Sequence, residues 1–198
     1  MREGEKMTET EPSLAERTQL IVDACQNERS ANPVAVFRRL AAQPFVRMHG
    51  PEHHVLDGAA FLVAYRNAGG EVDLSAALAE LQKRGLAMPG AMCGLWGMCG
   101  SAASVGAALS ILEGTGPLTA TSSWGSHMEL ASGILSAESA IGGPRCCKRN
   151  AYVALQKATA YARERFGVAM EGGPIACGDS DRNAQCLGAR CPFHPSQR

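Results

Sequence analysis

The stretch PEHHVLDGAAFLVAYRN, residues 51–67, predicts a helix with apolar side chains on nearly every face. A helix of this kind lies inside a protein, because each of its faces needs other apolar side chains around it. Gly69 and Gly70 follow and supply a usual end for such a helix. The stretch therefore indicates a buried helix within a small helical bundle.

Capping signals predict further helices on both sides of this stretch. Ser13 followed by Glu16 has the spacing of a capping box, and Asn32 with Pro33 is an N-cap followed by proline at the first helical position. Similar signals and apolar spacing predict helices at residues 13–28, 33–43, 74–84, 101–113, 126–140 and 144–166. No alternating strand pattern is present, so the expected fold class is mainly α, a compact helical domain with glycine-rich, cysteine-bearing loops.

Length and composition bound the domain organisation. A chain of 198 residues is long enough for one domain with its own core. We expect a disordered tail at residues 1–12 and a single helical metal-binding domain at 13–198. Within that domain, residues 13–87 form a helical half and residues 88–198 a cysteine-rich half.

Charge and hydropathy argue against several classes of function. The 19 basic residues balance the 19 acidic ones without forming a basic stripe, which argues against a nucleic-acid surface. The charged start of the chain lacks the apolar region of a signal peptide, and the most apolar stretch, residues 102–112, is too short to span a bilayer. We therefore expect a cytoplasmic protein that binds neither nucleic acid nor membrane; the sequence does not indicate its oligomeric state.

The cysteines carry the strongest chemical signal. The chain has 8 cysteines, and all except Cys25 lie between residues 93 and 191. They form three groups, which are Cys93 with Cys99, Cys146 with Cys147, and Cys177 with Cys186 and Cys191. In a cytoplasmic chain such thiols indicate metal binding or redox chemistry before disulfides. None of the groups has the Cys-x-x-Cys spacing typical of a zinc ribbon or a thioredoxin motif.

The adjacent cysteines lie in GGPRCCKRN, residues 142–150, where Pro144 is expected to open the last helix. Free amide groups at a helix start attract anions. Three neighbouring cations add positive charge: Arg145, Lys148 and Arg149. This setting predicts lowered pKa values for Cys146 and Cys147, and hence thiolates that ligate a metal or attack a substrate.

An iron-sulfur cluster held by thiolates is the anionic guest that this pattern favours, and a 4Fe-4S cluster is the expected cofactor. Cys99 precedes another expected helix, so a second positive helix end would face the same guest. The candidate ligands are Cys93, Cys99, Cys147, Cys177, Cys186 and Cys191. Zinc bound by four thiolates is the alternative metal, and a thiol redox or electron-transfer role is an alternative function.

Other polar residues complete the predicted site. Cys146 is the candidate nucleophile or sulfur acceptor, and Arg145 with Arg149 would bind a small anionic or sulfur-containing substrate. His53 and Asp57 have the i, i+4 spacing of a proton-transfer pair on one helix face. With one iron left open, the cluster would act as a Lewis acid in lyase or desulfidase-like chemistry. A zinc-organised, non-catalytic interaction module is the competing hypothesis.

Four stretches together carry a resemblance to a known family. They are MHGPEHHVLDGAAFLVAYRNAGG, CGLWGMCGSAASVGAALSI, GGPRCCKRNAYVAL and CPFHP, and they fall within residues 45–195. The chain resembles an uncharacterised family of cysteine-rich domains found in anaerobic bacteria and archaea, sometimes fused to S-adenosylmethionine-dependent methyltransferase domains. The resemblance implies an anaerobic setting and no reaction, and the protein would act alone or with a methyltransferase or redox partner protein. The chain itself lacks both a methyltransferase glycine loop and a Cys-x3-Cys-x2-Cys radical motif.

Overall fold

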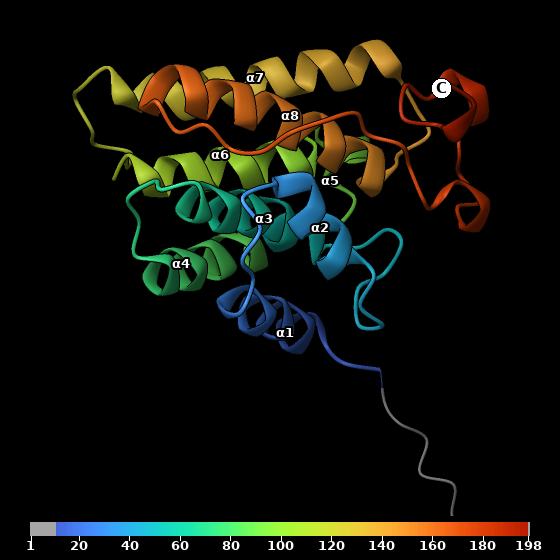
Figure 1. Cartoon of the computed structure of the whole chain (residues 1–198), viewed down its shortest axis with the longest axis horizontal. Coiled ribbons are helices and arrows are strands. Elements are labelled where there is room, and N and C mark those ends of the chain that lie inside the picture. The colour runs from blue at the N-terminus through green and yellow to red at the C-terminus, as the bar shows by residue number, and fades with distance from the viewer. Residues whose placement is uncertain (1–10, 198) are drawn as a thin grey trace, which may run out of the picture.

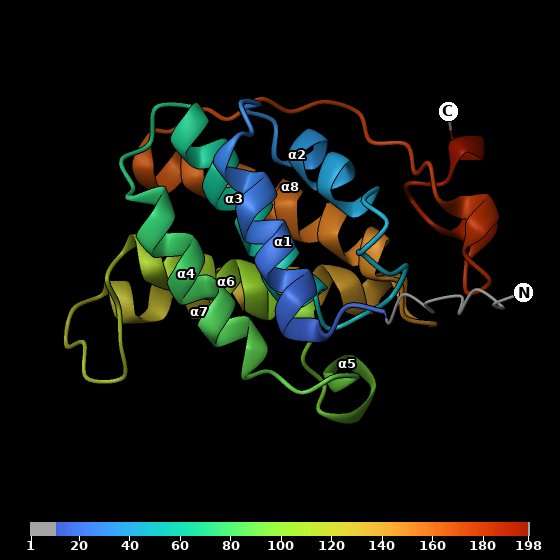
Figure 2. The same cartoon turned by 90° about the horizontal axis from the view of Figure 1, so that it is seen from below.

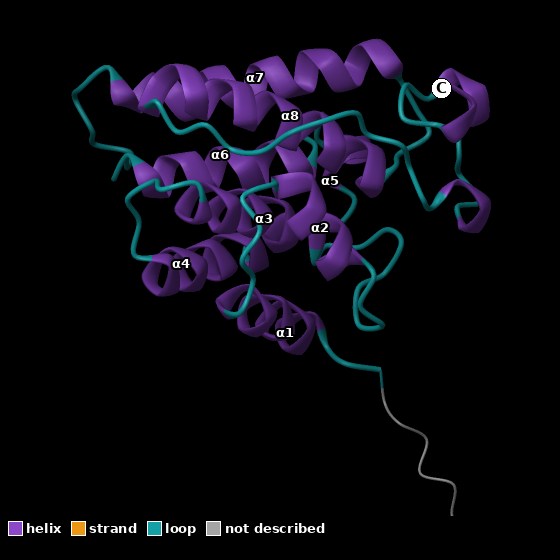
Figure 3. Ribbon diagram, viewed as in Figure 1, coloured by secondary structure: helices purple, strands orange, loops and turns teal. Residues whose placement is uncertain are grey.

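The structure, a computed structural model, describes residues 11–197 of the chain. Within this range it contains α-helices and short 3-10 turns but no strand (Figure 3). The helices are α1 Leu14–Gln26, α2 Pro33–Ala41, α3 His53–Asn67, α4 Leu74–Leu86, α5 Met92–Leu95, α6 Gly100–Leu112, α7 Ser123–Ile141 and α8 Cys147–Phe166. The expected mainly α class is therefore confirmed, with helices packed into a compact domain.

Helix α3 forms the centre of the fold, as its apolar sequence predicted. Every residue from His53 to Tyr65 is buried. The helices α1, α2, α4, α6 and α8 all pack against it (Figure 1). Its contact with α6 is close because Gly58 has no side chain: a Cβ at Gly58 would lie 2.6 Å from the Ser104 carbonyl oxygen. The Gly58 amide donates to the Ser104 hydroxyl at 2.9 Å, which joins the two helices.

Most helix boundaries follow the capping signals. Ser13 and Glu16 form both bonds of the predicted capping box, at 2.8 and 3.3 Å. The start predicted for α7 at residue 126 is wrong, since the helix begins at Ser123 and the Ser126 side chain is buried inside it. The start predicted for α8 at residue 144 is also wrong, because the helix begins at Cys147 with Cys146 as its N-cap. The short α5 was not predicted.

The segment after α8 brings the last cysteines back to the beginning of that helix. Residues 167–197 contain no α-helix and run along the domain toward the end where α8 starts (Figures 1 and 2). Three 3-10 turns shape its end, η1 Ser180–Arg182, η2 Gly188–Arg190 and η3 Pro195–Gln197. The Cys177 amide donates to the Phe193 carbonyl at 2.7 Å, and the Phe193 ring packs edge-on against Tyr152 of α8 at 5.3 Å.

Part of the predicted N-terminal tail lies outside the described residues, namely residues 1–10. The two described residues of that tail contact the domain. Glu11 pairs with Arg47 at 2.7 Å, and the Pro12 carbonyl accepts a bond from Arg17. Across residues 11–197, we find no helix with the length and hydropathy needed to cross a bilayer.

Candidate metal centre

Four cysteines line one small cavity at the beginning of α8. Cys146 comes from the N-cap of the helix, and Cys177, Cys186 and Cys191 come from the C-terminal segment. We call this the four-cysteine cavity; its volume is about 20 Å³, so a guest larger than a water molecule would displace the surrounding side chains. His194 also lines it.

Three of these sulfurs accept hydrogen bonds from backbone amides. The donors are the amides of Arg149 to Cys146 at 3.4 Å, of Asp179 to Cys177 at 3.3 Å, and of Gly188 to Cys186 at 3.3 Å. Each bond arises from local geometry, either the first turn of α8 or a tight turn two residues long. Amide donors stabilise negative charge on sulfur, so the backbone here favours thiolates.

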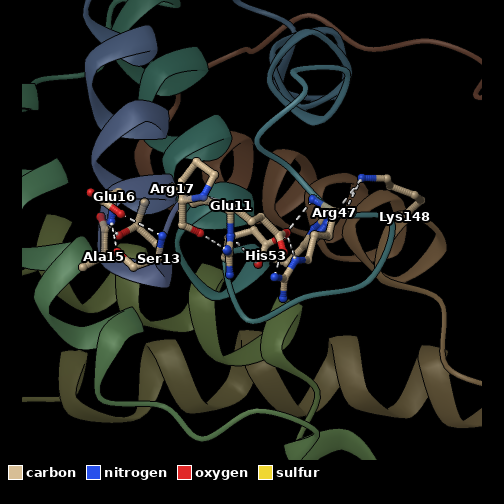
Figure 4. Close-up of polar contacts among 11 residues, drawn as sticks. Glu11, Ser13, Ala15, Glu16, Arg17, Arg47, His53 and Lys148 are labelled. Atoms are coloured by element: carbon tan, nitrogen blue, oxygen red, sulfur yellow. Dashed lines mark hydrogen bonds and ion pairs between the residues drawn. The ribbon is translucent and has the colours of Figure 1, made fainter. Parts of the chain in front are cut away.

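Two buried cations add to this preference. Lys148 and Arg149 line the four-cysteine cavity, and their side chains are 2% and 4% exposed. The Lys148 ammonium lies 3.4 Å from the Arg47 carbonyl oxygen and 3.3 Å from His53 Nε2 (Figure 4). No carboxylate forms an ion pair with Lys148 in residues 11–197. Burial lowers the pKa of Lys148, and the charges of Asp179 and Asp57 offset this only in part. A further anion in the cavity would offset more of the cost of the buried cation.

The predicted lowering of the cysteine pKa values is wrong for the thiols as they stand in this structure. Burial raises the pKa of Cys146 despite the Arg149 amide, and it raises the pKa of Cys147 to about 12. Burial also raises the pKa of Cys177. The loss of hydration raises the thiol pKa values more than the helix start and the nearby cations lower them. A bound metal cation would lower these pKa values, because it deprotonates its thiol ligands.

The other three cysteines of this half lie around a neighbouring cavity. Cys93, Cys99 and Cys147 line a space of about 240 Å³ together with His49, His53, His54 and Arg145, which we call the histidine cavity. Its size suits a small organic molecule. Cys146 lines both cavities and so forms part of the wall between them.

A chain of hydrogen bonds connects the two cavities. The Cys147 amide donates to His49 Nδ1 at 3.4 Å, so His49 Nε2 carries the proton and donates to Asn183 Oδ1 at 3.0 Å. The Asn183 amide nitrogen then donates to the Cys146 sulfur at 3.4 Å. The Cys146 sulfur thus accepts bonds from both the Asn183 side chain and the Arg149 amide.

The predicted pairing of His53 with Asp57 is confirmed as a contact. His53 Nδ1 lies 3.2 Å from Asp57 Oδ1, and both side chains are buried. Asp57 Oδ2 has no hydrogen-bond partner within the described residues. The other ring nitrogen of His53 faces Lys148 and the Arg47 carbonyl, and the ring lines the histidine cavity.

The structure separates the remaining predicted site residues. Cys146 lies with the three C-terminal cysteines, whereas Cys147 lies with Cys93 and Cys99 in the histidine cavity. Arg145 is exposed at that cavity. Arg149 instead donates through Nη2 to the Pro144 carbonyl at 3.1 Å and lines the four-cysteine cavity.

Sequence reasoning missed the polar residues that support the sulfurs. Asn183 and Asn150 each donate a side-chain amide bond to a cysteine sulfur, Cys146 and Cys99 respectively. Each asparagine is far in sequence from the cysteine that it contacts, so no local pattern indicated its role. Glu138, beside Cys99, was missed for the same reason.

A family model identifies the family of the chain. The model of a family of unknown function, DUF5714, matches residues 21–194. The protein belongs to this family. Searches of curated proteins and of solved structures returned no match. The family thus covers both cavities and assigns no activity to either.

Proposed function

We propose that the protein binds a 4Fe-4S cluster through Cys146, Cys177, Cys186 and Cys191. The observation that carries this proposal is the convergence of these thiols on one small cavity from two segments that are distant in sequence. From the sequence we expected Cys147 to be a ligand and Cys146 to be free. The proposal reverses this, so that Cys146 is the ligand and Cys147 is free. Cys93 and Cys99 also fall outside the ligand set.

The donor set of the four-cysteine cavity fits such a cluster. Thiolates are the usual ligands of iron-sulfur clusters, and amide bonds to their sulfurs tune the reduction potential. Lys148 and Arg149 would compensate the net negative charge of a cluster with four thiolates. The bonds from Asp179, Gly188 and Asn183 would orient the sulfurs and limit access of water.

Zinc is the competing guest. Thiolates that share one zinc ion lie close together, because each bond to the ion is about 2.3 Å. The thiolates of a four-iron cluster bind separate irons and lie further apart. Within residues 11–197, no group of three or more His, Cys, Asp or Glu side chains is close enough to hold a single ion. Metal and acid-labile sulfide analysis distinguishes the two guests.

With all four irons ligated, the cluster would supply one-electron transfer, which makes the protein a carrier for a redox partner. An enzymatic role is the second candidate, and the histidine cavity supports it because Cys146 separates the two spaces. If Cys146 were free, an open iron would supply Lewis-acid chemistry toward a small anionic or sulfur-containing substrate. In that role Arg145 would bind the anion, and His53 with Asp57 would move protons. A methyltransferase-linked, anaerobic setting is compatible with either candidate.

Purification without oxygen, followed by iron, zinc and acid-labile sulfide analysis, tests the proposal. We expect brown protein with about four irons and four sulfides per chain. Electron paramagnetic resonance of the reduced protein then separates the candidates, because a trial substrate changes the spectrum only when an iron is open. Colourless protein with stoichiometric zinc and no sulfide would show that the cluster assignment is wrong.

A further inference from the structure

A second group of reactive side chains surrounds Cys99, outside the proposed ligand set. Cys99 is the N-cap of α6 and is 8% exposed. It lines the histidine cavity and also a third cavity, of about 600 Å³, which we call the Glu138 cavity. Cys93, Arg145 and Asn150 line both of these cavities as well. The Cys99 sulfur is therefore reachable from a space that admits a small molecule.

Glu138 is a buried carboxylate with an unsatisfied oxygen at this place. It comes from α7, it is 8% exposed, and its Oε1 has no hydrogen-bond partner among the described residues. Glu138 and Cys99 line the same cavity. An unpaired buried carboxylate oxygen is costly, so its presence in the wall of this cavity calls for an explanation.

A side-chain amide fixes the position of the Cys99 sulfur. The Asn150 side-chain nitrogen donates to Cys99 Sγ at 3.1 Å. Arg149 Nε donates to Asn150 Oδ1 at 3.1 Å, and this bond sets which end of the amide faces the sulfur. A donor aimed at sulfur stabilises the negative charge that develops there during attack.

We propose that Cys99 is a nucleophilic thiol, that Glu138 accepts its proton, and that Arg145 recruits small electrophiles carrying a carboxylate. In the step, the Cys99 S–H bond breaks and its proton passes to the Glu138 carboxylate. The electron pair on sulfur forms a bond to the electrophilic carbon, whose leaving group departs with its own electron pair. Arg145 is exposed at the shared rim of both cavities and can pair with the carboxylate through two N–H groups.

Burial supports the base role of Glu138 by raising its pKa to about 7, close to the value that suits proton transfer at neutral pH. The Cys99 thiol itself stays protonated at rest, since burial raises its pKa to about 12. Its reactivity therefore depends on transfer of the proton during attack. This inference does not rest on the cluster proposal, because none of its groups belongs to the four-cysteine ligand set.

Alkylation of the anaerobically purified protein, followed by peptide mass spectrometry at Cys99, tests the inference. Iodoacetate is the anionic probe and iodoacetamide is its neutral analogue. We expect Glu138→Gln to slow alkylation of Cys99 about 100-fold, the lower end of general-base effects, while the exposed-surface control Glu164→Gln changes nothing. Unchanged alkylation in Glu138→Gln would overturn the proposal.

A second variant tests anion recruitment without altering the core. Arg145 is exposed, so Arg145→Met is expected to fold normally and to lower the ratio of iodoacetate to iodoacetamide labelling at Cys99 about fivefold. Equal ratios in both proteins would contradict the role of Arg145. Cys25, which is fully buried in the core, serves as the internal standard for unreactive thiol. Iron and sulfide contents are measured on the same samples, so failure of this inference and failure of the cluster proposal give separate results.

Discussion

The helical half around α3 and the C-terminal segment after α8 are held together by different forces. In α3, every side chain from His53 to Tyr65 is buried among neighbouring helices. In residues 167–197, only Met170, Asn183, Cys191 and Phe193 are buried, and amide groups point at sulfur atoms. Apolar burial stabilises the first region, whereas on our proposal the order of the second depends on what its cysteines bind.

Loss of one ligand would show this difference most strongly. We expect Cys177→Ala to abolish binding of iron and sulfide and to increase amide hydrogen exchange in residues 174–194, with α3 unchanged. Cys93→Ala is the matched control, because Cys93 lies in the same half of the chain but outside the four-cysteine cavity. Metal content and exchange mass spectrometry give the result. Full metal content in Cys177→Ala, or loss of metal in Cys93→Ala, would contradict the ligand assignment.

A glycine pair tests the helical half without touching the metal site. Gly58→Ala would place a Cβ 2.6 Å from a backbone oxygen of α6, so we expect a loss of about 1–3 kcal/mol in unfolding free energy. Gly133→Ala in α7 has nothing within 4 Å of the new Cβ and should gain about 0.5–1 kcal/mol. Denaturant unfolding measures both. Equal effects of the two substitutions would show that the α3–α6 contact is not close.

The buried Lys148 contacts the helical half and lines the four-cysteine cavity. Its replacement should stabilise the metal-free protein and weaken metal binding in the metal-bound protein. In metal-free protein, Lys148→Met removes a buried cation and is expected to raise the free energy of unfolding by about 1 kcal/mol. In metal-bound protein, the same variant should release iron to a chelator faster, because the cluster loses a compensating charge. Lys157→Met, at an exposed position of the same helix, is the control. A variant that retains iron as well as the wild type would contradict the charge role.

The smallest effect concerns an ion pair of the helical half. The Arg39 hydrogen bond holds the pKa of Glu28 at about 2, below the value of about 4.3 for an unfolded chain. The pair therefore stabilises the fold above pH 4 and loses this contribution as the pH falls toward 2. Since Arg39 is half exposed, Arg39→Met should cost only about 0.5–1 kcal/mol at pH 7, and most of this cost should be gone near pH 2. A constant difference across this pH range would refute the assignment.

The helical half could be predicted from sequence because its signals are local. The capping box at Ser13 and the apolar run of α3 lie within single helices, and the structure confirms both. The division of the adjacent cysteines could not be predicted in this way. It depends on the point at which α8 begins, and Pro144 indicated a start three residues too early. A shift of this size moves Cys146 out of the first turn to the N-cap.

The supporting residues of the candidate site could not be predicted for a different reason. Asn183 reaches Cys146 across 37 positions, and Asn150 reaches Cys99 across 51. Contacts at such separation arise from the packing of whole elements and leave no spacing pattern. Sequence composition indicated a thiol-based site, and the folded chain was needed to sort seven thiols into two groups.

X-ray absorption at the iron edge of anaerobically purified wild-type protein tests the central claim most directly. If Cys146, Cys177, Cys186 and Cys191 hold one 4Fe-4S cluster, the iron spectrum shows a first shell of sulfur alone and a second shell of neighbouring iron. A protein without iron, whose zinc-edge spectrum shows four sulfur neighbours at about 2.3 Å, would contradict the account.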